Sequence, residues 1–212
     1  MNKTLIITGG NIDEQFLANE VKQNYEIIIA VDRGLETAQK LGIHINHIVG
    51  DFDSVNPDIL TKYKDNVIIH KLNPEKDYTD THMALKLAIE LGSKEVTIIG
   101  WSGTRIDHML GNIHIMKEAI EQNIICKLIN KTNEIELINK KTILEKDNNY
   151  KYISLIPLTT EASGITLQGF KYPLQDAVLK IGESIGISNE QLEEKATIEI
   201  KKGILILIKS KD

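Results

Sequence analysis

The sequence has one cysteine, no long hydrophobic run and no excess of basic residues, and each of these shortages excludes a class of protein. The single cysteine, Cys126, cannot form a disulfide within the chain, which excludes a disulfide-stabilised scaffold. The most apolar late run, residues 204–208, is far shorter than the roughly 20 residues that span a bilayer. The amino terminus leads directly into a predicted strand and leaves no room for the apolar region of a signal peptide. We therefore expect a cytoplasmic protein with no membrane partner.

Acidic residues outnumber basic ones, with 30 Asp and Glu against 25 Lys and Arg, for a net charge of -5 at pH 7. Nucleic-acid binding normally requires a basic surface, so no nucleic-acid partner is expected. The rest of the composition, 42% hydrophobic and 26% charged, is ordinary for a globular protein. A chain of 212 residues accommodates one large domain or two small ones.

Strands alternate with helices through the first part of the chain. Short β-branched runs predict strands at 4–7, 26–31, 45–49, 67–70, 96–99 and 124–129. Segments between them predict helices at 12–23, 35–42, 56–64, 83–91 and 106–122, two of which are closed by Gly42 and Gly92. This alternation predicts an α/β fold, with an open, mostly parallel sheet that carries helices on both faces.

The pattern changes after residue 130, because strands then follow one another without long helices. They are predicted at 134–138, 142–145, 151–157, 164–168, about 177–182, 195–201 and 203–208, with turn residues such as Gly164 and Gly169 between them. This part of the chain predicts a smaller all-β sandwich or barrel. We place the boundary within 130–145 and divide the chain into domains 1–132 and 133–212.

Aspartates follow the predicted strands of the first domain or lie in the loops that lead to the next helix. They are Asp32, Asp51, Asp53, Asp77, Asp80 and Asp107. In a parallel sheet such loops lie along one edge, and ligands bind in the crevice outside the carboxyl ends of the strands. Carboxylates gathered in one cleft repel one another unless a cation is present, and a bound cation attracts phosphate. The spacing thus predicts a cation and phosphate site at this edge.

The segment Gly50-Asp51-Phe52-Asp53-Ser54 gives the clearest metal signal, because two carboxylates at the end of a strand suit Mg²⁺. Simpler structural roles remain open. Asp53 and Ser54 can cap a following helix, and Thr79 or Asp80 can cap the helix at 83–91. Asp107 can favour the amino-terminal dipole of its own helix.

Arginine occurs at only two positions, Arg33 and Arg105, and both lie in aspartate-bearing loops. The planar guanidinium group binds phosphate or carboxylate through two parallel hydrogen bonds, which lysine cannot do. The alternative is that each arginine forms a structural ion pair with a neighbouring aspartate. Gly10 ends the first strand in a Gly-Gly turn, which is a weak phosphate-loop signal. His108 is either a general base or an ordinary polar residue, and Trp101 either stacks on a ligand or packs.

Four loops, taken in order, resemble those of the thiamine pyrophosphokinases. They are Asp32-Arg33-Gly34, Gly50-Asp51-Phe52-Asp53-Ser54, Lys76-Asp77-Tyr78-Thr79-Asp80 and Gly100-Trp101-Ser102-Gly103-Thr104-Arg105-Ile106-Asp107-His108. The late segments 186–190 and 203–208 also look like the second domain of that family. Any one motif is weak, but the ordered set covers nearly the whole chain. Thr104 departs from the family pattern, in which a second glycine is common at this position.

The resemblance implies a homodimer with an α/β catalytic domain and a β-sandwich domain for thiamine binding and dimerisation. It implies a Mg²⁺-dependent transfer of the diphosphoryl group of ATP to thiamine, giving thiamine diphosphate and AMP. The implied catalytic residues are Asp51, Asp53, Asp80, Arg105 and Asp107, of which Asp51, Asp53 and Asp80 hold the metal. The implied residues at the ATP, metal and thiamine sites are Asp32, Arg33, Lys76, Asp77, Thr79, His108, Ser188 and Asn189, the last two at thiamine between subunits. Gly10 joins them as a candidate from its Gly-Gly turn.

The residues leave two questions open. Either Asp51 or Asp107 can accept the proton of the thiamine hydroxyl, and the sequence does not choose between them. An acid-rich strand edge also suits a metal-dependent phosphohydrolase, or a module that binds nucleotide or thiamine without turnover. Formation of AMP that depends on thiamine separates these possibilities.

Overall fold

The computed structural model describes residues 2–51, 63, 67–72 and 77–212, and the chain divides into two compact units, Met1–Lys131 and Thr132–Asp212. The helix predicted at 56–64 lies outside the described residues except for Tyr63, which is helical. Within the described ranges, no helix is both long and apolar enough to cross a membrane.

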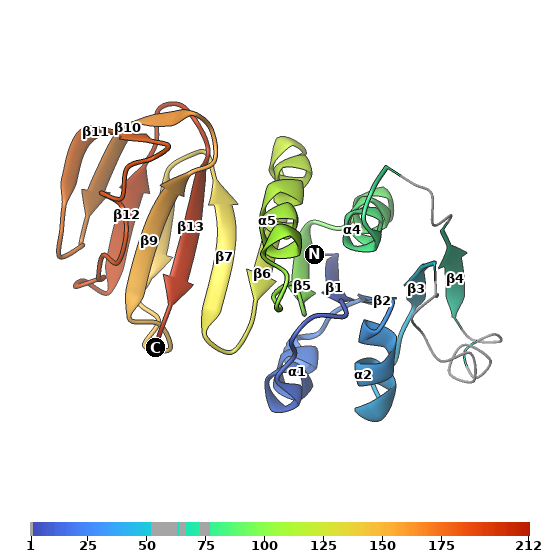
Figure 1. Ribbon diagram of the computed structural model, residues 1–212. Helices are drawn as coiled ribbons and strands as arrows, with labels where there is room; N and C mark the ends of the chain where they lie inside the picture. Colours follow the sequence, from blue (N-terminus) through green and yellow to red (C-terminus); the bar gives the residue numbers. More distant parts are fainter. Residues whose placement is uncertain (1, 52–62, 64–66, 73–76) are drawn as a thin grey trace. The chain divides into compact units, whose positions relative to one another are not determined.

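A parallel sheet forms the centre of the first unit (Figure 1). Its strands are β1 (Lys3–Ile7), β2 (Ile27–Val31), β3 (His47–Gly50), β4 (Ile68–Lys71), β5 (Glu95–Ile99) and β6 (Ile125–Ile129). They lie in the order β4-β3-β2-β1-β5-β6, and each neighbouring pair is parallel. Ile6 of β1 pairs with Ile29 on one side and Ile98 on the other. The strands that follow β1 directly in the chain, β2 to β4, lie on one side of it, whereas β5 and β6 lie on the other side. At this change in strand order, a crevice opens at the carboxyl ends of β1 and β5.

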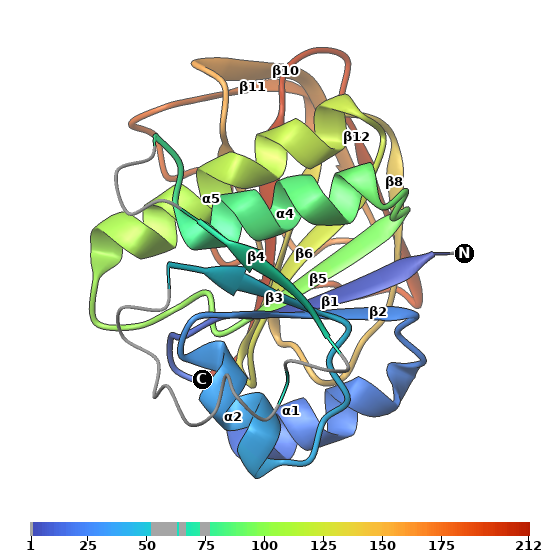
Figure 2. The ribbon, with the colours of Figure 1, turned by 90° about the vertical axis from the view of Figure 1, so that its right-hand side faces the viewer.

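Helices cover both faces of this sheet, as the alternating pattern predicted. They are α1 (Glu14–Glu20), the 3-10 turn η1 (Val21–Gln23), α2 (Gly34–Lys40), α4 (Asp80–Glu90) and α5 (Ile106–Glu121). Figures 1 and 2 show α1 and α2 on one face and α4 and α5 on the other. The helix predicted at 12–23 is shorter than expected. The Asp13 carboxylate caps its start by accepting from the Phe16 N–H at 2.9 Å, and the left-handed Asn24 ends the turn that follows.

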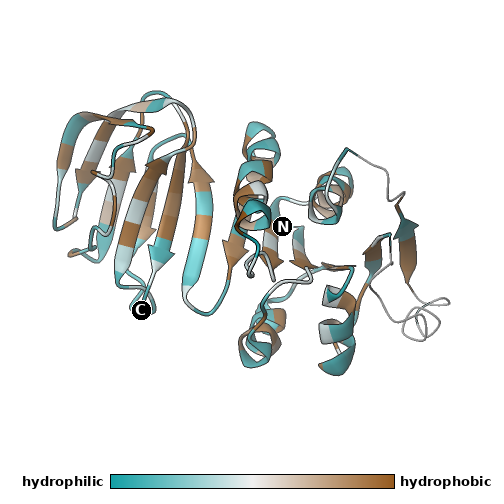
Figure 3. Ribbon diagram, viewed as in Figure 1, coloured by the Kyte–Doolittle hydropathy of each residue, from teal (hydrophilic) through white to brown (hydrophobic). Residues whose placement is uncertain are grey.

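The first core is apolar because strands buried on both faces consist of β-branched and aliphatic residues. Leu5, Ile6 and Ile7 are fully buried, and the brown strands of Figure 3 mark the same apolar runs. Leu17 of α1 and Leu35 of α2 pack into this core from one face. The helices are therefore held by the burial of their apolar sides, and their amino-terminal ends are left at the edge where the strands end.

The second unit contains only strands, in antiparallel pairs. They are β7 (Asn133–Ile138), β8 (Thr142–Glu145), β9 (Tyr152–Pro157), β10 (Glu161–Gln168), β11 (Leu174–Lys180), β12 (Lys195–Glu199) and β13 (Leu205–Ser210). β13 lies between β7 and β9, and a four-stranded sheet has the order β11-β10-β12-β8. Leu155 and Leu207 from the first group pack with Ile165 and Ile198 from the second. This shared core makes the unit a β-sandwich, as predicted.

The prediction of a turn at Gly164 was wrong. Gly164 lies inside β10 with φ +69°, at a shift in the register between β10 and β11. A β-bulge of this kind needs a residue that tolerates a left-handed backbone, which explains the glycine without a chain reversal.

Two glycines in the helices of the first unit should respond oppositely to substitution by alanine. A Cβ atom at Gly34 would overlap the carbonyl oxygen of Ile7, whereas a Cβ at Gly111 of α5 would meet nothing within 4 Å. We expect Gly34→Ala to lower the free energy of unfolding by about 3 kcal/mol and Gly111→Ala to raise it by about 1 kcal/mol. Urea-induced unfolding followed by circular dichroism measures both. Equal stability of the two variants would contradict the packing of α2 against β1.

Candidate active site

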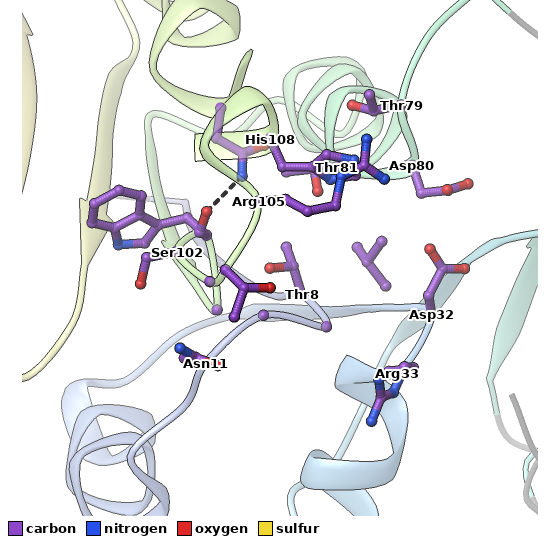
Figure 4. A pocket seen from close by; sticks show the side chains of 18 residues that line it. Thr8, Asn11, Asp32, Arg33, Thr79, Asp80, Thr81, Ser102, Arg105 and His108 are labelled. Carbon is purple, nitrogen blue, oxygen red and sulfur yellow. Dashed lines mark hydrogen bonds between the residues drawn. The ribbon is translucent and has the colours of Figure 1, made fainter. Parts of the chain in front are cut away.

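A cavity of about 420 Å³ lies at the carboxyl edge of the first sheet. The loops after β1, β2 and β5 line it, together with the first residues of α4 and α5. Figure 4 shows Asp80, Arg105 and His108 on one side, and Asp32 and Arg33 on the opposite side. The cavity therefore combines both signs of charge at the crevice that the strand order creates.

Backbone hydrogen bonds fasten the loop after β1 to the loop after β5. The Gly10 N–H donates to the Gly100 carbonyl at 3.0 Å, and the Asn11 N–H donates to the Ser102 carbonyl at 2.7 Å. A Cβ at Gly10 would overlap both of these carbonyl oxygens, and a Cβ at Gly100 would overlap the carbonyl of Thr8. The glycines are thus needed for the close approach of the two loops, which form one side of the cavity.

Two helices point their amino-terminal ends at the cavity. Thr79 caps α4, and its hydroxyl accepts from the His82 N–H at 3.3 Å. Arg105 precedes α5 and makes no side-chain cap bond. The N–H groups of the first helical turn and the positive end of the dipole favour a bound anion at such positions. Both Thr79 and Arg105 line the cavity, so the backbone itself contributes positive potential there.

Asp32 has a strained backbone within the lining of the cavity. Its φ is +46°, a left-handed conformation that costs a non-glycine residue of order 1 kcal/mol. The Asp32 N–H donates to the Val49 carbonyl at 3.2 Å, and the Leu35 N–H of α2 donates to the Asp32 carbonyl at 3.0 Å. These backbone bonds hold Asp32, and with it the carboxylate, in the turn that connects β2 to α2. Strain retained at such a position is typical of functional sites.

Arg105 and Asp107 form an ion pair at the start of α5. The Arg105 Nη2 lies 2.6 Å from Asp107 Oδ2, and Nε lies 3.2 Å from Oδ1. The hydrogen bond from Arg105 is the main cause that lowers the pKa of Asp107 to about 2, and the same bond raises the pKa of Arg105. Both side chains are about two-thirds exposed, so the pair adds little to stability and can exchange partners.

Seven of the predicted site residues line the cavity, and the others fall into three groups. The seven are Gly10, Asp32, Arg33, Thr79, Asp80, Arg105 and His108. Asp51, Asp77 and Asp107 are described but do not belong to this lining. Asp51 nevertheless follows β3 directly, at the same edge, where Val49 pairs with Val31 of β2. Asp53 and Lys76 lie outside the described residues.

Ser188 and Asn189 belong to the second unit. Ser188 is exposed and left-handed, with φ +56°. The Asn189 amide is buried and holds the loop around it: its Nδ2 donates to the Tyr172 carbonyl at 2.8 Å, and its Oδ1 accepts from the N–H groups of Tyr172 and Glu190. In this conformation Asn189 orders the loop that presents Ser188.

The carboxylates at this edge are chemically suited to Mg²⁺. Among the described residues, no three His, Cys, Asp or Glu side chains form a ready metal cluster, and Asp53 lies outside those residues. Asp32 and Asp80 both line the cavity, and their carboxylates point to the same region of it (Figure 4). One or two carboxylates, completed by phosphate oxygens and water, form the usual protein site for Mg²⁺. The donor set therefore fits this ion.

Asn112 lines the cavity and was not predicted from the sequence. It lies in α5, and its Nδ2 donates to the Trp101 carbonyl at 2.8 Å. The sequence does mark this position, because Asn112 interrupts the apolar stripe formed by Met109, Ile113 and Met116. A polar side chain on the buried face of a helix needs a partner, and here the partner is the loop after β5.

Comparisons with known proteins agree with this architecture. Residues 18–128 match the family model described as "Thiamin pyrophosphokinase, catalytic domain", and residues 140–205 match "Thiamin pyrophosphokinase, vitamin B1 binding domain". The chain belongs to the thiamine pyrophosphokinase family. Thiamine pyrophosphokinases are ATP-dependent diphosphotransferases, which places the chain in this class of enzyme.

Individual thiamine pyrophosphokinases resemble the chain over most of its length. The thiamine pyrophosphokinase of Bacillus subtilis is 38% identical over 186 residues, which cover 87% of each chain. A crystal structure of thiamine pyrophosphokinase from Bacillus subtilis superposes with a TM-score of 0.91 at 34% identity, covering 100% of both chains. The structure from Geobacillus thermodenitrificans superposes with a TM-score of 0.86 at 26% identity, covering 100% of this chain and 98% of the other.

The ion pair at the start of α5 can be tested by titration. In Arg105→Gln, the pKa of Asp107 should rise from about 2 towards the ordinary value of 3.8, because its main hydrogen-bond donor is lost. The contribution of this exposed pair to stability is small; it is present above pH 3.8 and is lost as the pH falls through about 2. Carbon-13 NMR of the aspartate carboxyls measures the shift. Lys117→Gln, which removes another cation of α5, is the control and should leave Asp107 unchanged. An Asp107 titration that is the same in Arg105→Gln and the intact protein would contradict the pairing.

Proposed function

We propose that this protein transfers the diphosphoryl group of ATP to thiamine in a Mg²⁺-dependent reaction, giving thiamine diphosphate and AMP. The observation that carries the proposal is one cavity that contains two carboxylates, two arginines and two helix amino termini. Transfer of phosphoryl-type groups requires mainly positioning and charge neutralisation, and these groups supply both.

The cationic groups of the cavity would bind the polyphosphate. Arg105 and Arg33 lie on opposite sides of the cavity, so they can contact different phosphates of one chain. The amino-terminal ends of α4 and α5 add backbone N–H groups. Lys76, which the family resemblance assigns to the same role, would add a further charge. Because the Arg105–Asp107 pair is exposed, Arg105 can leave Asp107 for phosphate at little cost.

Asp51, Asp53 and Asp80 would hold the metal, with Asp32 and Asp77 close to it. When bound, Mg²⁺ neutralises negative charge that develops on the phosphate oxygens. Asp32 and Asp80 contribute acceptor oxygens inside the cavity, and Asp51 is at the same sheet edge. The acidic surroundings also suit thiamine, which is a cation.

Asp51 and Asp107 are the two candidates to accept the proton of the thiamine hydroxyl. The hydrogen bond from Arg105 lowers the pKa of Asp107 to about 2, and Asp107 becomes a stronger base when Arg105 leaves it for phosphate. His108 lines the cavity and is placed to hydrogen-bond a ligand there.

The second unit would bind thiamine, and the active enzyme would be a cytoplasmic homodimer. Support comes from the match of residues 140–205 to a vitamin B1 binding domain. Ser188 is the exposed residue of the loop that Asn189 orders. It would contact a thiamine molecule that lies between this subunit and its partner.

The reaction can be tested by measuring AMP with ATP, Mg²⁺ and thiamine supplied together or singly. We expect AMP only when all three are present. Asp80→Asn should lower turnover roughly 100-fold, because it removes an anionic oxygen from the proposed metal site. The matched control is Asp147→Asn, which removes the same charge from an exposed turn of the second unit and should retain full turnover.

Other outcomes point to other functions. Formation of AMP without thiamine would indicate a phosphohydrolase, and binding of ATP or thiamine without turnover would indicate a binding module. Equal turnover of Asp80→Asn and Asp147→Asn would contradict the assignment of Asp80.

A further inference from the structure

Asn112 occupies a position on α5 where an apolar residue would be expected. It is 8% exposed, and Met116, one turn further along the same face, is 1% exposed. Asparagine is a weak helix former, and burial removes its amide from water. Asparagine is therefore favoured at this position only if its amide forms a hydrogen bond that an apolar side chain could not form. That amide donates to the Trp101 carbonyl at 2.8 Å, across the loop that leads from β5 into α5.

The Trp101 carbonyl is one of three consecutive carbonyls that are bonded to other elements. Gly10 and Asn11 of the loop after β1 donate to the carbonyls of Gly100 and Ser102. Between them, Trp101 accepts from Asn112. The Ser102 hydroxyl also accepts from the Asn130 Nδ2 at 3.3 Å. The first half of the loop is therefore held from three directions, and Asn112 supplies the bond from the helix that the loop enters.

This arrangement has two consequences for a ligand in the cavity. Carbonyl oxygens repel phosphate, and the Trp101 carbonyl repels it less while it accepts the hydrogen bond from Asn112. The bond also fixes the loop relative to the first turns of α5, so that Arg105 and His108 enter the cavity from a defined position. A displacement of about 1 Å in such a group is enough to lower a rate strongly.

We propose that Asn112 is a positioning residue for the polyphosphate of ATP. It acts through the Trp101 carbonyl and sets the path of residues 101–105, which carry Arg105 to the phosphates. This inference rests on the proposed function, because it takes ATP as the ligand of the cavity. It assigns no contact between Asn112 and thiamine, so the two substrates should respond differently to its loss.

Three variants separate positioning from a general effect on stability. Asn112→Ala removes the donor and part of the side chain. Asn112→Asp keeps the shape but replaces the amide donor with a carboxylate oxygen, which repels the Trp101 carbonyl. Met116→Ala is the matched control, because it truncates a buried side chain of the same helix that does not line the described cavity.

The kinetic measurement is the steady-state rate with each substrate varied in turn, at a temperature where all variants are folded. We expect Asn112→Ala and Asn112→Asp to lower kcat/KM for ATP about tenfold or more and to change the KM for thiamine less than twofold. Met116→Ala should change neither. If the KM for thiamine rose as much as kcat/KM for ATP fell, Asn112 would be only structural. An equal fall of kcat/KM for ATP in Met116→Ala would also overturn the proposal.

A second measurement does not depend on turnover. Hydrogen–deuterium exchange of the ligand-free protein should be faster at residues 101–105 in both Asn112 variants and unchanged at residues 125–129 of β6. If wild type fails to form AMP but the exchange result holds, the proposed function fails while the positioning of the loop stands. If wild type is active and exchange at 101–105 is unchanged in the variants, the inference about Asn112 fails by itself.

Discussion

The parallel pairing of β1 with β2 on one side and β5 on the other is the constraint on which the site depends. It brings the ends of three strands to one edge, and their loops must then share a small space. The close approach of Gly10 to Gly100 and Ser102 follows from this pairing, since any side chain at Gly10 would separate the loops. The helices that follow these loops begin at the same edge, because each helix crosses back over the sheet. The cavity is thus a consequence of strand order.

Electrostatics gives this cavity its chemical character. Each side of the cavity carries one carboxylate and one arginine, Asp80 with Arg105 and Asp32 with Arg33. The proposed magnesium–polyphosphate ligand needs both signs of charge. Arg105 is paired with Asp107, and this pairing lowers the pKa of Asp107. The guanidinium group of Arg105 is about two-thirds exposed in this pair. The left-handed Asp32 shows that backbone strain is tolerated at the same place.

The sequence predicted the parallel sheet, the sandwich and much of the cavity, and the physical reasons are specific. Runs such as Leu5-Ile6-Ile7 are buried on both faces, so hydrophobicity alone identified the strands. The aspartates and arginines after those strands lie at one edge because parallel strands all end there. Hydrogen bonds between backbone groups leave no side-chain pattern, so the bonds that join the two loops were not foreseen.

Other features depended on tertiary context. The bulge at Gly164 looks like a turn in sequence, because both require a left-handed backbone. Asn112 was assigned to an ordinary amphipathic helix, because its partner is a carbonyl 11 residues away that periodicity does not reveal. The pairing of Arg105 with Asp107 was foreseen only as an alternative, since spacing does not determine whether a carboxylate binds a metal or a neighbouring cation.

The central claim is that aspartates from separate loops share one metal ion with the phosphates of ATP. Mn²⁺ can replace Mg²⁺, and electron–nuclear double resonance then detects the nuclei that coordinate it. With a non-hydrolysable ATP analogue and protein labelled with carbon-13 at the aspartate carboxyls, we expect coupling of Mn²⁺ to both phosphorus and carboxyl carbon, with the carbon signal reduced in Asp80→Asn. Coupling to phosphorus alone would mean that the nucleotide holds the metal without the protein, and would contradict the account.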